Sequence, residues 1–569
     1  MAVTQLPPTE RTLAYEGIEG ILRRQSLRES AARTYARSLP IVPVRARGLT
    51  IEGADGSRYL DCLSGAGTLA LGHNHPVVLE AIRSVLDSGA PLHVLDLATP
   101  VKDAFTSELF ATLPRELADR ARVQFCGPAG TDAVEAALTL VRTATGRDGL
   151  FAFTGAYHGM TTGALAASGG APGVSVTRLP YPYDYRCPFG TGGEHGAELS
   201  ARWTETLLDD HKSGAPDPAA MILEPVQGEG GVIPAPDSWL RRMREITAAR
   251  GIPLIADEVQ TGVGRTGAFW AVDHSGIVPD VMVLSKAIGG SLPLAVVVYR
   301  DDLDVWRPGA HAGTFRGNQL AMAAGAATLA FVRENGLAQR AAELGERMLR
   351  RLREFAERWP CVGDVRGRGL MMGLELVDVR AEPTSGPAPG RTAAETERGP
   401  GAYTRQGTGQ SAEQAAPHRA EPGRAHRTGR DAGPGAAYDT RPGPAYDGER
   451  GTARSGGPSI AGHGTGPGAG QRAGHGGPPC SGAPRRGPLP AAPGLASTVQ
   501  QECLRRGLIV ELGGRDSSVV RLLPPLTISD EQAEAVLDRL ADAIGAAERT
   551  AAEAADAPLP QQQTTGRGR

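Results

Sequence analysis

Lysine is scarce in this chain: of 60 basic residues only three are lysines, at positions 102, 212 and 286. Cysteine is also sparse and scattered, at positions 62, 126, 187, 361, 480 and 503, with no CxxC pair. This spacing argues against a disulfide framework and against a zinc site, and it is typical of free thiols in a reducing cytosol. We therefore expect no metal centre, and we look for chemistry at the few lysines.

Long apolar runs are missing as well. No stretch approaches the roughly 18–20 apolar residues needed to span a bilayer, and residues 1–10 lack a basic region followed by an apolar segment. The formal net charge of −3 gives no reason to expect nucleic acid or an anionic membrane as a partner. A cytoplasmic protein that acts on small molecules is the expectation.

Short apolar segments alternate with helical stretches between residues 76 and 335. This alternation predicts an α/β fold with a mostly parallel sheet and helices on both faces. The strands that we expect are 122–126, 150–153, 221–226, 254–259, 281–285 and 294–299. Ligands of such sheets bind beyond the carboxyl ends of the strands.

Two charged residues stand at the ends of predicted buried strands. Lys286 follows Val-Met-Val-Leu-Ser and precedes Ala-Ile-Gly-Gly, and Asp257 ends Ile-Pro-Leu-Ile-Ala. A lysine in such a place is costly unless it is paired or covalently engaged. The pair suits pyridoxal phosphate, because a lysine can bind the cofactor aldehyde and an aspartate can keep the pyridine nitrogen protonated. The alternative is a surface lysine and a helix-capping aspartate.

A glycine-containing turn precedes a predicted helix. In Phe-Cys-Gly-Pro-Ala-Gly130-Thr131-Asp132 the glycines let the backbone approach a ligand, and the free N–H groups of a helix start suit a phosphate dianion. An ordinary turn with Thr131 as the helix N-cap is the alternative, and both uses share one geometry.

The composition changes abruptly near residue 380. Residues 381–493 contain one isoleucine, one leucine and no valine, phenylalanine, methionine or tryptophan. Such a segment cannot bury enough apolar surface to offset its ordering entropy, so we predict disorder. The predicted organisation is an N-terminal arm and small-domain segment (1–75), a large cofactor-binding domain (76–335), a small α+β domain (336–380 and 496–548), a disordered insert (381–495) and a flexible tail (549–569).

The segment Ile-Ala-Asp257-Glu-Val-Gln-Thr-Gly-Val-Gly-Arg-Thr-Gly followed by Leu-Ser-Lys286-Ala-Ile-Gly-Gly resembles the signature of the class III pyridoxal-phosphate aminotransferases. This resemblance implies a fold-type I enzyme, with a large seven-stranded-type sheet domain and a smaller α+β domain built from both chain ends. It implies pyridoxal 5'-phosphate as the cofactor and ping-pong kinetics. It also implies a homodimer with shared active sites.

The resemblance assigns roles to further residues. Gly130 and Thr131 would hold the cofactor phosphate, and Tyr157, in Gly-Ala-Tyr-His-Gly, would stack on the pyridine ring. Gln260 would bind the phenolic oxygen, and Thr314 would reach the phosphate of the neighbouring subunit. His158 is as compatible with a structural role as with a site contact, and Glu258 is expected to be structural.

Substrate selection is expected from Glu229 and Arg521. The family pattern implies that Arg521 pairs with a carboxylate of 2-oxoglutarate or glutamate in bidentate geometry. Glu229 would neutralise Arg521 when an ω-amine substrate is bound.

Four further segments resemble one subgroup, the diaminobutyrate–2-oxoglutarate transaminases: 62–76, 127–135, 181–190 and 313–320. The resemblance covers residues 12–379 and 496–545. It implies reversible transfer of the 4-amino group of L-2,4-diaminobutyrate to 2-oxoglutarate. Ornithine, acetylornithine or 4-aminobutyrate as the amine is the alternative, and a racemase, a mutase or a scaffold that uses the insert is a more distant one.

Overall fold

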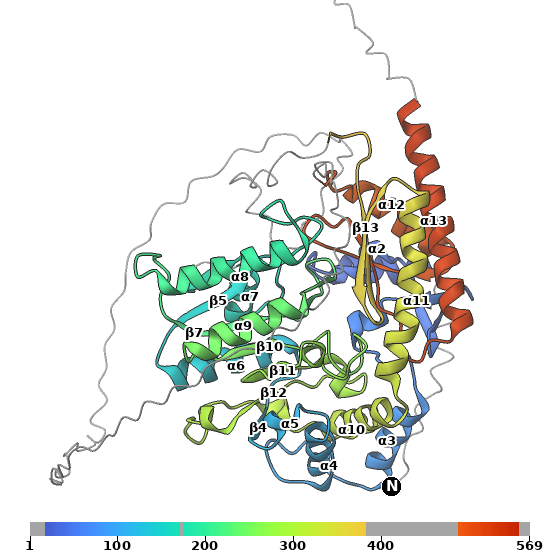
Figure 1. Ribbon diagram of the computed structural model, residues 1–569. Coiled ribbons are helices and arrows are strands. Elements are labelled where there is room, and N and C mark those ends of the chain that lie inside the picture. The colour runs from blue at the N-terminus through green and yellow to red at the C-terminus, as the bar shows by residue number, and fades with distance from the viewer. Residues whose placement is uncertain (1–17, 171–173, 383–487, 557–569) are drawn as a thin grey trace, which may run out of the picture. The chain divides into compact units, whose positions relative to one another are not determined.

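Seven strands form the largest sheet of the computed structural model, which describes residues 18–170, 174–382 and 488–556 (Figure 1). In sheet order they are β4 (Ala121–Phe125), β12 (Val296–Arg300), β11 (Val281–Leu284), β10 (Leu254–Asp257), β7 (Pro218–Leu223), β5 (Gly149–Phe153) and β6 (Val176–Leu179). Strand β12 runs antiparallel to both of its neighbours, and the other strand pairs are parallel. The expected mostly parallel, seven-stranded sheet is confirmed.

Each of the six predicted strands is present, five of them within two residues of the expected bounds. The strand expected over 221–226 begins earlier, at Pro218, and ends at Leu223, because Glu224 and Pro225 turn the chain away. The edge strand β6 was not predicted. It has four residues, of which only Leu179 is buried, so it carries too little apolar pattern to identify.

Both faces of this sheet are buried. Alternate residues of one strand, such as Leu150 and Ala152, pack in the cluster that includes helix α6 (Gly130–Thr145). Phe151 and Phe153 point to the opposite face, where Phe153 meets Trp239 of α9 (Asp237–Ala249) with ring centroids 5.0 Å apart. Burial on both faces explains why these strands read as continuous apolar runs.

Two four-stranded sheets lie outside the large one. The first joins β1 (Pro43–Arg47), β2 (Thr50–Gly53), β3 (Arg58–Asp61) and β15 (Leu508–Ile509). The second joins β13 (Val362–Arg368), β14 (Met371–Leu376), β17 (Val519–Leu522) and β16 (Glu511–Gly513). Both sheets therefore combine strands from the two sides of the segment 383–487.

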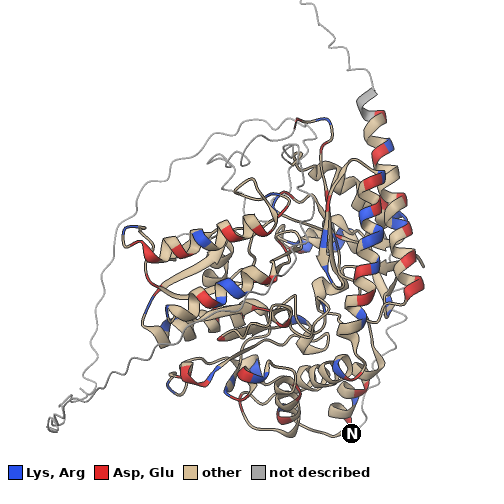
Figure 2. Ribbon diagram, in the orientation of Figure 1, with Lys and Arg blue, Asp and Glu red and all other residues tan. Residues whose placement is uncertain are grey.

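Two long helices, α11 (Leu337–Arg358) and α13 (Asp530–Asp556), lie side by side at the right of Figure 1. The buried residues of α11, such as Leu344, Met348 and Leu352, follow helical spacing. Figure 2 shows that positively and negatively charged residues alternate along both helices.

The remaining helices are α1 (Ile18–Arg28), α2 (Tyr35–Ser38), α3 (Pro76–Asp87), α4 (Pro100–Phe110), α5 (Arg115–Ala118), α7 (Thr162–Ser168), α8 (Gly193–Asp209), α10 (Gln319–Glu334) and α12 (Pro493–Arg505). Short 3₁₀ helices are η1 (Ser64–Gly67), η2 (Ala271–His274), η3 (Lys286–Gly289), η4 (Asp301–Leu303) and η5 (Thr314–Gly317), and β8 (Val226–Gln227) pairs with β9 (Ile233–Pro234). None of the helices within the described ranges is long and apolar enough to cross a bilayer.

Most of the predicted insert, residues 383–487, lies outside the described residues, and so do the tail residues 557–569. The edges of both predictions were wrong. Residues 488–495 have defined structure, because Ala491 bridges to Val377, the N–H of Asp378 donates to the carbonyl of Pro490 at 2.9 Å, and α12 already begins at Pro493. Helix α13 continues through the predicted tail to Asp556, because this stretch is rich in alanine and glutamate, which favour helix. The division into domains remains a prediction.

Candidate active site

Lys286 is the first residue of η3, immediately beyond the carboxyl end of β11. Its φ of +51° places the backbone in the left-handed region. A non-glycine residue there costs roughly 1–2 kcal/mol, and such strain concentrates at functional sites. The preceding residue is fixed, since the hydroxyl of Ser285 donates to the carbonyl of Leu294 at 2.9 Å. The fold therefore holds this lysine in a defined and costly conformation.

The electrostatic environment of Lys286 combines charges of both signs. Burial lowers the pKa of its amine, Glu229 opposes that shift most strongly, and Arg521 adds to the lowering. Within the described residues, no hydrogen bond or ion pair engages the Lys286 Nζ. An amine with a lowered pKa and no fixed partner is suited to attack a carbonyl group, since only the neutral form is nucleophilic.

Asp257 is the last residue of β10, the strand next to β11, and it is buried. Its Oδ1 accepts from the N–H of Val259 at 3.0 Å, and its Oδ2 lies 2.7 Å from Nδ1 of His158. The imidazole is itself buried, and its Nε2 has no hydrogen-bond partner among the described residues. His158, which the sequence left undecided, thus belongs to the site and orients the carboxylate of Asp257.

A second buried carboxylate, Glu224, supports the same region. Burial raises its pKa to about 7, and Asp257 adds to the rise while His158 opposes it. The two carboxylate oxygens accept the backbone N–H groups of Tyr157, at 3.0 Å, and Gly228, at 3.1 Å. Glu224 therefore fixes the backbone on which Tyr157 and Glu229 stand. Glu258, by contrast, accepts from Thr261 and from the N–H of Val272, which is a structural arrangement.

Helix α6 begins at Gly130, against Val259 and Ser285, which lie just beyond the ends of β10 and β11. A Cβ on Gly130 would lie 3.1 Å from Cγ1 of Val259 and 3.5 Å from Cβ of Ser285, so a side chain would crowd this contact. The helix N-cap is Ala129, whose N–H donates to Oδ2 of Asp132, and Thr131 is not the N-cap.

The hydroxyl of Thr131 lies 2.6 Å from that of Thr161 and accepts the N–H of Thr161 at 3.1 Å. These contacts tie the helix start to the loop that follows Tyr157 and His158. The free N–H groups of this helix start can hold a phosphate.

Gln260 lies three residues beyond Asp257. Its Nε2 donates to the carbonyl of Ala66 at 3.1 Å, and its buried Oε1 has no partner within the described ranges. A Cβ on Gly228 would lie 1.9 Å from that Oε1, so any larger residue there would displace the Gln260 side chain. Tyr157 is 38% exposed, which leaves part of its ring free to contact a ligand.

Thr314, also a predicted site residue, is exposed. It begins η5, and its carbonyl contacts Nε2 of His93. In the described part of the chain, no hydrogen bond joins Thr314 to another predicted site residue.

Arg521 is fully buried on β17, and two carboxylates surround it. Its Nη2 lies 2.9 Å from both oxygens of Glu229 and 2.8 Å from Oε2 of Glu511. Burial would raise the pKa of Glu229, but Arg521 and Lys286 outweigh it and hold that pKa below its usual value. The pair that the sequence predicted is thus formed, next to the charge of Lys286.

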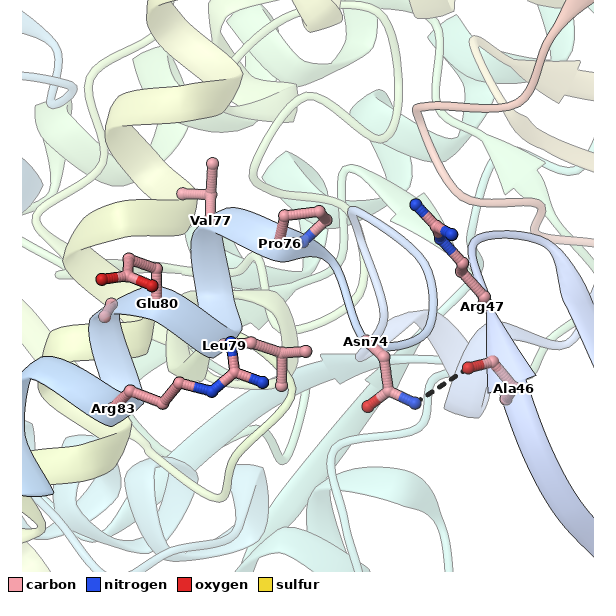
Figure 3. Close-up of a pocket in the computed structure, with 9 residues that line it drawn as sticks. Ala46, Arg47, Asn74, Pro76, Val77, Leu79, Glu80 and Arg83 are labelled. Carbon is pink, nitrogen blue, oxygen red and sulfur yellow. Dashed lines mark hydrogen bonds between the residues drawn. The ribbon is translucent and has the colours of Figure 1, made fainter.

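A surface hollow of about 870 Å³ lies elsewhere, between the end of β1 and the start of α3 (Figure 3). Arg47, Asn74, Glu80 and Arg83 are among its lining residues, and Nδ2 of Asn74 donates to the carbonyl of Ala46. No predicted site residue lines this hollow. Chemistry, and not cavity size, therefore identifies the site.

The residues around Lys286 fit pyridoxal phosphate. The free amine of Lys286 and the buried carboxylate of Asp257 are groups that a cofactor aldehyde and ring nitrogen require, and the unpartnered Oε1 of Gln260 can accept from a phenolic hydroxyl. The start of α6 lies beside them and suits a phosphate.

Comparison with known proteins agrees with this site. Residues 31–405 match the family described as Aminotransferase class-III. The chain belongs to the class-III aminotransferases. The family that the motifs led us to expect is thereby confirmed.

Two relatives of this class-III aminotransferase are diaminobutyrate–2-oxoglutarate aminotransferases. The protein of Rhizobium meliloti (strain 1021) is 46% identical over 539 residues, which cover 93% of this chain and 93% of the relative. The protein of Haemophilus influenzae is 51% identical over 388 residues, which cover 66% of this chain and 84% of the relative. An amine transaminase from an uncultivated Pseudomonas species, solved in its PLP-bound form, matches with a TM-score of 0.65 and 24% identity over 91% of this chain and 98% of that one. The last likeness shows the fold alone.

Sequence reasoning assigned no role to three residues of this class-III aminotransferase: Glu224, Glu511 and Tyr35. Glu224 stands beside a predicted motif, but only its backbone partners disclose its role. Glu511 and Tyr35 are far apart in sequence, and the hydroxyl of Tyr35 donates to Oε1 of Glu511 at 2.7 Å. No local signal could have joined them.

Proposed function

We propose that this enzyme transfers the 4-amino group of L-2,4-diaminobutyrate to 2-oxoglutarate, giving L-aspartate 4-semialdehyde and L-glutamate, with pyridoxal 5'-phosphate as its cofactor. The main support is sequence identity to two diaminobutyrate–2-oxoglutarate aminotransferases. It is 46% over 93% of the length of one and 51% over 84% of the length of the other. The Glu229–Arg521 pair next to Lys286 supports transamination, because racemases and mutases need no clamp for a second, dicarboxylate substrate.

When bound, pyridoxal phosphate supplies an electrophilic carbonyl and a ring that accepts electrons. Lys286 would hold the cofactor covalently, and its freed amine would then move the proton at the reacting carbon as general acid and base. A lowered pKa suits this work, because the amine must both accept and release a proton near neutral pH.

The other residues would orient and hold the cofactor. Asp257, oriented by His158, would keep the ring nitrogen protonated. Tyr157 would stack on the ring, the Gln260 side chain would meet the phenolic oxygen, and the α6 start with Gly130 and Thr131 would hold the phosphate.

Arg521 would distinguish the two substrates that share this site. A second carboxylate of 2-oxoglutarate or glutamate would displace Glu229 and bind Arg521 in bidentate geometry. With diaminobutyrate bound, Glu229 would stay on Arg521 and keep this clamp closed.

A homodimer with shared sites is part of the proposal. Leu97 and Phe315 are 65% and 67% exposed, and exposed apolar clusters mark interaction surfaces. The two segments that carry them are joined, since the N–H of Val94 donates to the carbonyl of Gly317 and the ring of His93 lies 5.5 Å from that of Phe315. Thr314 stands in this surface, from which it would reach the phosphate in the partner's site.

The test of function uses purified, cofactor-loaded enzyme with diaminobutyrate carrying ¹⁵N at its 4-amino group. We expect the label in glutamate and aspartate 4-semialdehyde as the carbonyl product, both identified by mass, and no transfer by Lys286→Ala. Absence of label from glutamate would refute the assignment. Faster transfer from ornithine, acetylornithine or 4-aminobutyrate would move the substrate to that amine.

The test of shared sites uses hybrid dimers of Lys286→Ala and Thr314→Val subunits, each inactive or impaired alone. In a hybrid, the subunit with Thr314→Val keeps its Lys286 and receives Thr314 from its partner, so one of the two sites is intact. We expect mixing to restore activity. Unchanged activity in hybrids of confirmed composition would contradict sharing.

A further inference from the structure

Arg521 has a second carboxylate partner that backbone pairing puts in place. Strands β16 and β17 are antiparallel, and Glu511 stands directly opposite Arg521 in their register. Directly opposite side chains on one face lie close together, which accounts for the 2.8 Å between Oε2 of Glu511 and Nη2 of Arg521. This contact follows from the sheet, so it persists as long as the two strands stay paired.

The two carboxylates around Arg521 differ in freedom. Glu229 lies on the turn between β8 and β9, and its side chain is 36% exposed. Glu511 lies within a strand, and its side chain is 7% exposed. Its other oxygen accepts the hydroxyl of Tyr35 on α2 at 2.7 Å. Glu229 can therefore leave Arg521 by a side-chain rotation, whereas Glu511 is held from two sides.

The guanidinium of Arg521 also has unused hydrogen-bond donors. Its Nε and Nη1 are buried and have no hydrogen-bond partner in residues 18–170, 174–382 and 488–556. Its Nε lies over Gly513, where a Cβ would be only 2.6 Å away, so the absence of a side chain at this position leaves room for the guanidinium. An unpaired buried donor is costly, so these groups favour the arrival of an acceptor from a ligand.

The negative charge of Glu511 affects which substrate binds, because Arg521 already faces Glu229. One guanidinium cannot fully neutralise two carboxylates: burial and the nearby Glu229 raise the pKa of Glu511, although Arg521 and the hydrogen bond from Tyr35 oppose the rise. Both carboxylates also act on the charge of Lys286. When a substrate carboxylate replaces Glu229, Glu511 stays, and it repels the incoming group while it shares Arg521 with it. With an amine substrate bound, the same surplus negative charge attracts the ammonium group.

We infer that Glu511, held by Tyr35, is a fixed counter-ion of Arg521 that weakens binding of the dicarboxylate substrate and favours the diamine. The inference rests on the proposed function for the identity of the two substrates. Glu511 acts through Arg521 and is a positioning residue.

The experiment compares Glu511→Gln with wild type as cofactor-loaded enzyme. Glutarate, a dicarboxylate that cannot react, serves as the probe, and its dissociation constant is measured by calorimetry. We expect Glu511→Gln to bind glutarate about tenfold more tightly, because the amide keeps the shape and removes the competing charge. We also expect the KM for 2-oxoglutarate to fall and the KM for diaminobutyrate to rise, so that the two half-reactions change in opposite directions.

Tyr35→Phe gives an independent variant should Glu511→Gln fold poorly. Loss of the donated hydrogen bond makes ionised Glu511 less favourable, so glutarate binding should tighten by a smaller factor. In the Glu511→Gln background the same change should add little, which a double-mutant cycle measures. Glu502→Gln on α12, whose carboxylate pairs with Arg505 and Arg506 outside the site, is the matched control and should leave glutarate binding unchanged.

Weaker glutarate binding in Glu511→Gln, or an equal change of both half-reactions, would overturn the inference and leave Glu511 a structural residue. Glutarate binding requires no turnover, so this result stands apart from the proposed function. That function fails separately, if wild type moves no nitrogen from diaminobutyrate to 2-oxoglutarate.

Discussion

Replacement of Arg521 by lysine tests the switch between the two substrates. Lysine keeps the positive charge that Glu511 and Glu229 require, but it cannot form a bidentate contact with a carboxylate. Alanine is a poorer probe, because it would leave Glu511, with a side chain only 7% exposed, without its counter-ion. Breaking a buried ion pair in this way costs about 3–5 kcal/mol of stability. Arg521→Lys separates recognition from folding, and Arg521→Ala does not.

The magnitude follows from the contacts. Arg521 is fully buried and offers a planar group with Nε and Nη1 unpaired, whereas lysine offers one ammonium group. The loss of one charge-assisted hydrogen bond to the substrate costs about 1.5–3 kcal/mol, which is roughly 10- to 150-fold in affinity. In the proposed function diaminobutyrate leaves this clamp closed, so its half-reaction should change by less than about threefold, within roughly 0.7 kcal/mol.

The assay follows each half-reaction alone, by stopped-flow absorbance of the cofactor, with diaminobutyrate and with glutamate as the amino donor. The melting temperature of the loaded protein reports folding. We expect the glutamate half-reaction to lose 10- to 150-fold in kcat/KM, in line with the hydrogen-bond estimate above, while the diamine half-reaction persists. Equal loss in both half-reactions, with an unchanged melting temperature, would refute the switch.

Three further outcomes are expected. Asp257→Asn should slow both half-reactions by several orders of magnitude without unfolding, because a neutral amide cannot hold a ring nitrogen protonated; a near-normal rate would contradict this role. The pKa of Glu224 is about 7 in the folded protein, above its usual value of 4.5, which we take for the unfolded chain. The wild type therefore loses stability as the pH rises from about 4.5 to 7. The melting temperature of Glu224→Gln relative to wild type should therefore be higher at pH 8 than at pH 5, and a difference independent of pH would count against the raised pKa. A short Gly-Ser link in place of residues 383–487 should preserve turnover and subunit association, because Asp378 and Pro490 already lie side by side; loss of either property would show that the segment matters.

The large sheet could be predicted because its signals are local. Fully buried strands such as β10 and β11 are continuous apolar runs, and a charged residue that ends such a run is visible in the sequence itself. The edge strand β6 was not predicted, because a strand with one buried residue shows no alternation of apolar and polar residues. The boundary near 488 was not predicted because composition averages over a window, whereas the Val377–Ala491 bridge is a single contact. The end of α13 was missed because the helix propensity of its alanine and glutamate residues was not weighed.

The sequence by itself determined the chemistry of this protein: Lys286 and Asp257 at strand ends, a glycine turn before a helix, and a family signature that joins them. Tertiary structure decided how those groups are held. His158 orients Asp257 across 99 positions of the chain, and Glu511 meets Tyr35 across 476. Hydrogen bonds and charge act over a few ångströms, so partners distant in sequence are chosen only when strands pair and helices pack. For that reason the identity of the reaction was readable along the chain, and the balance of carboxylates around Arg521 was not.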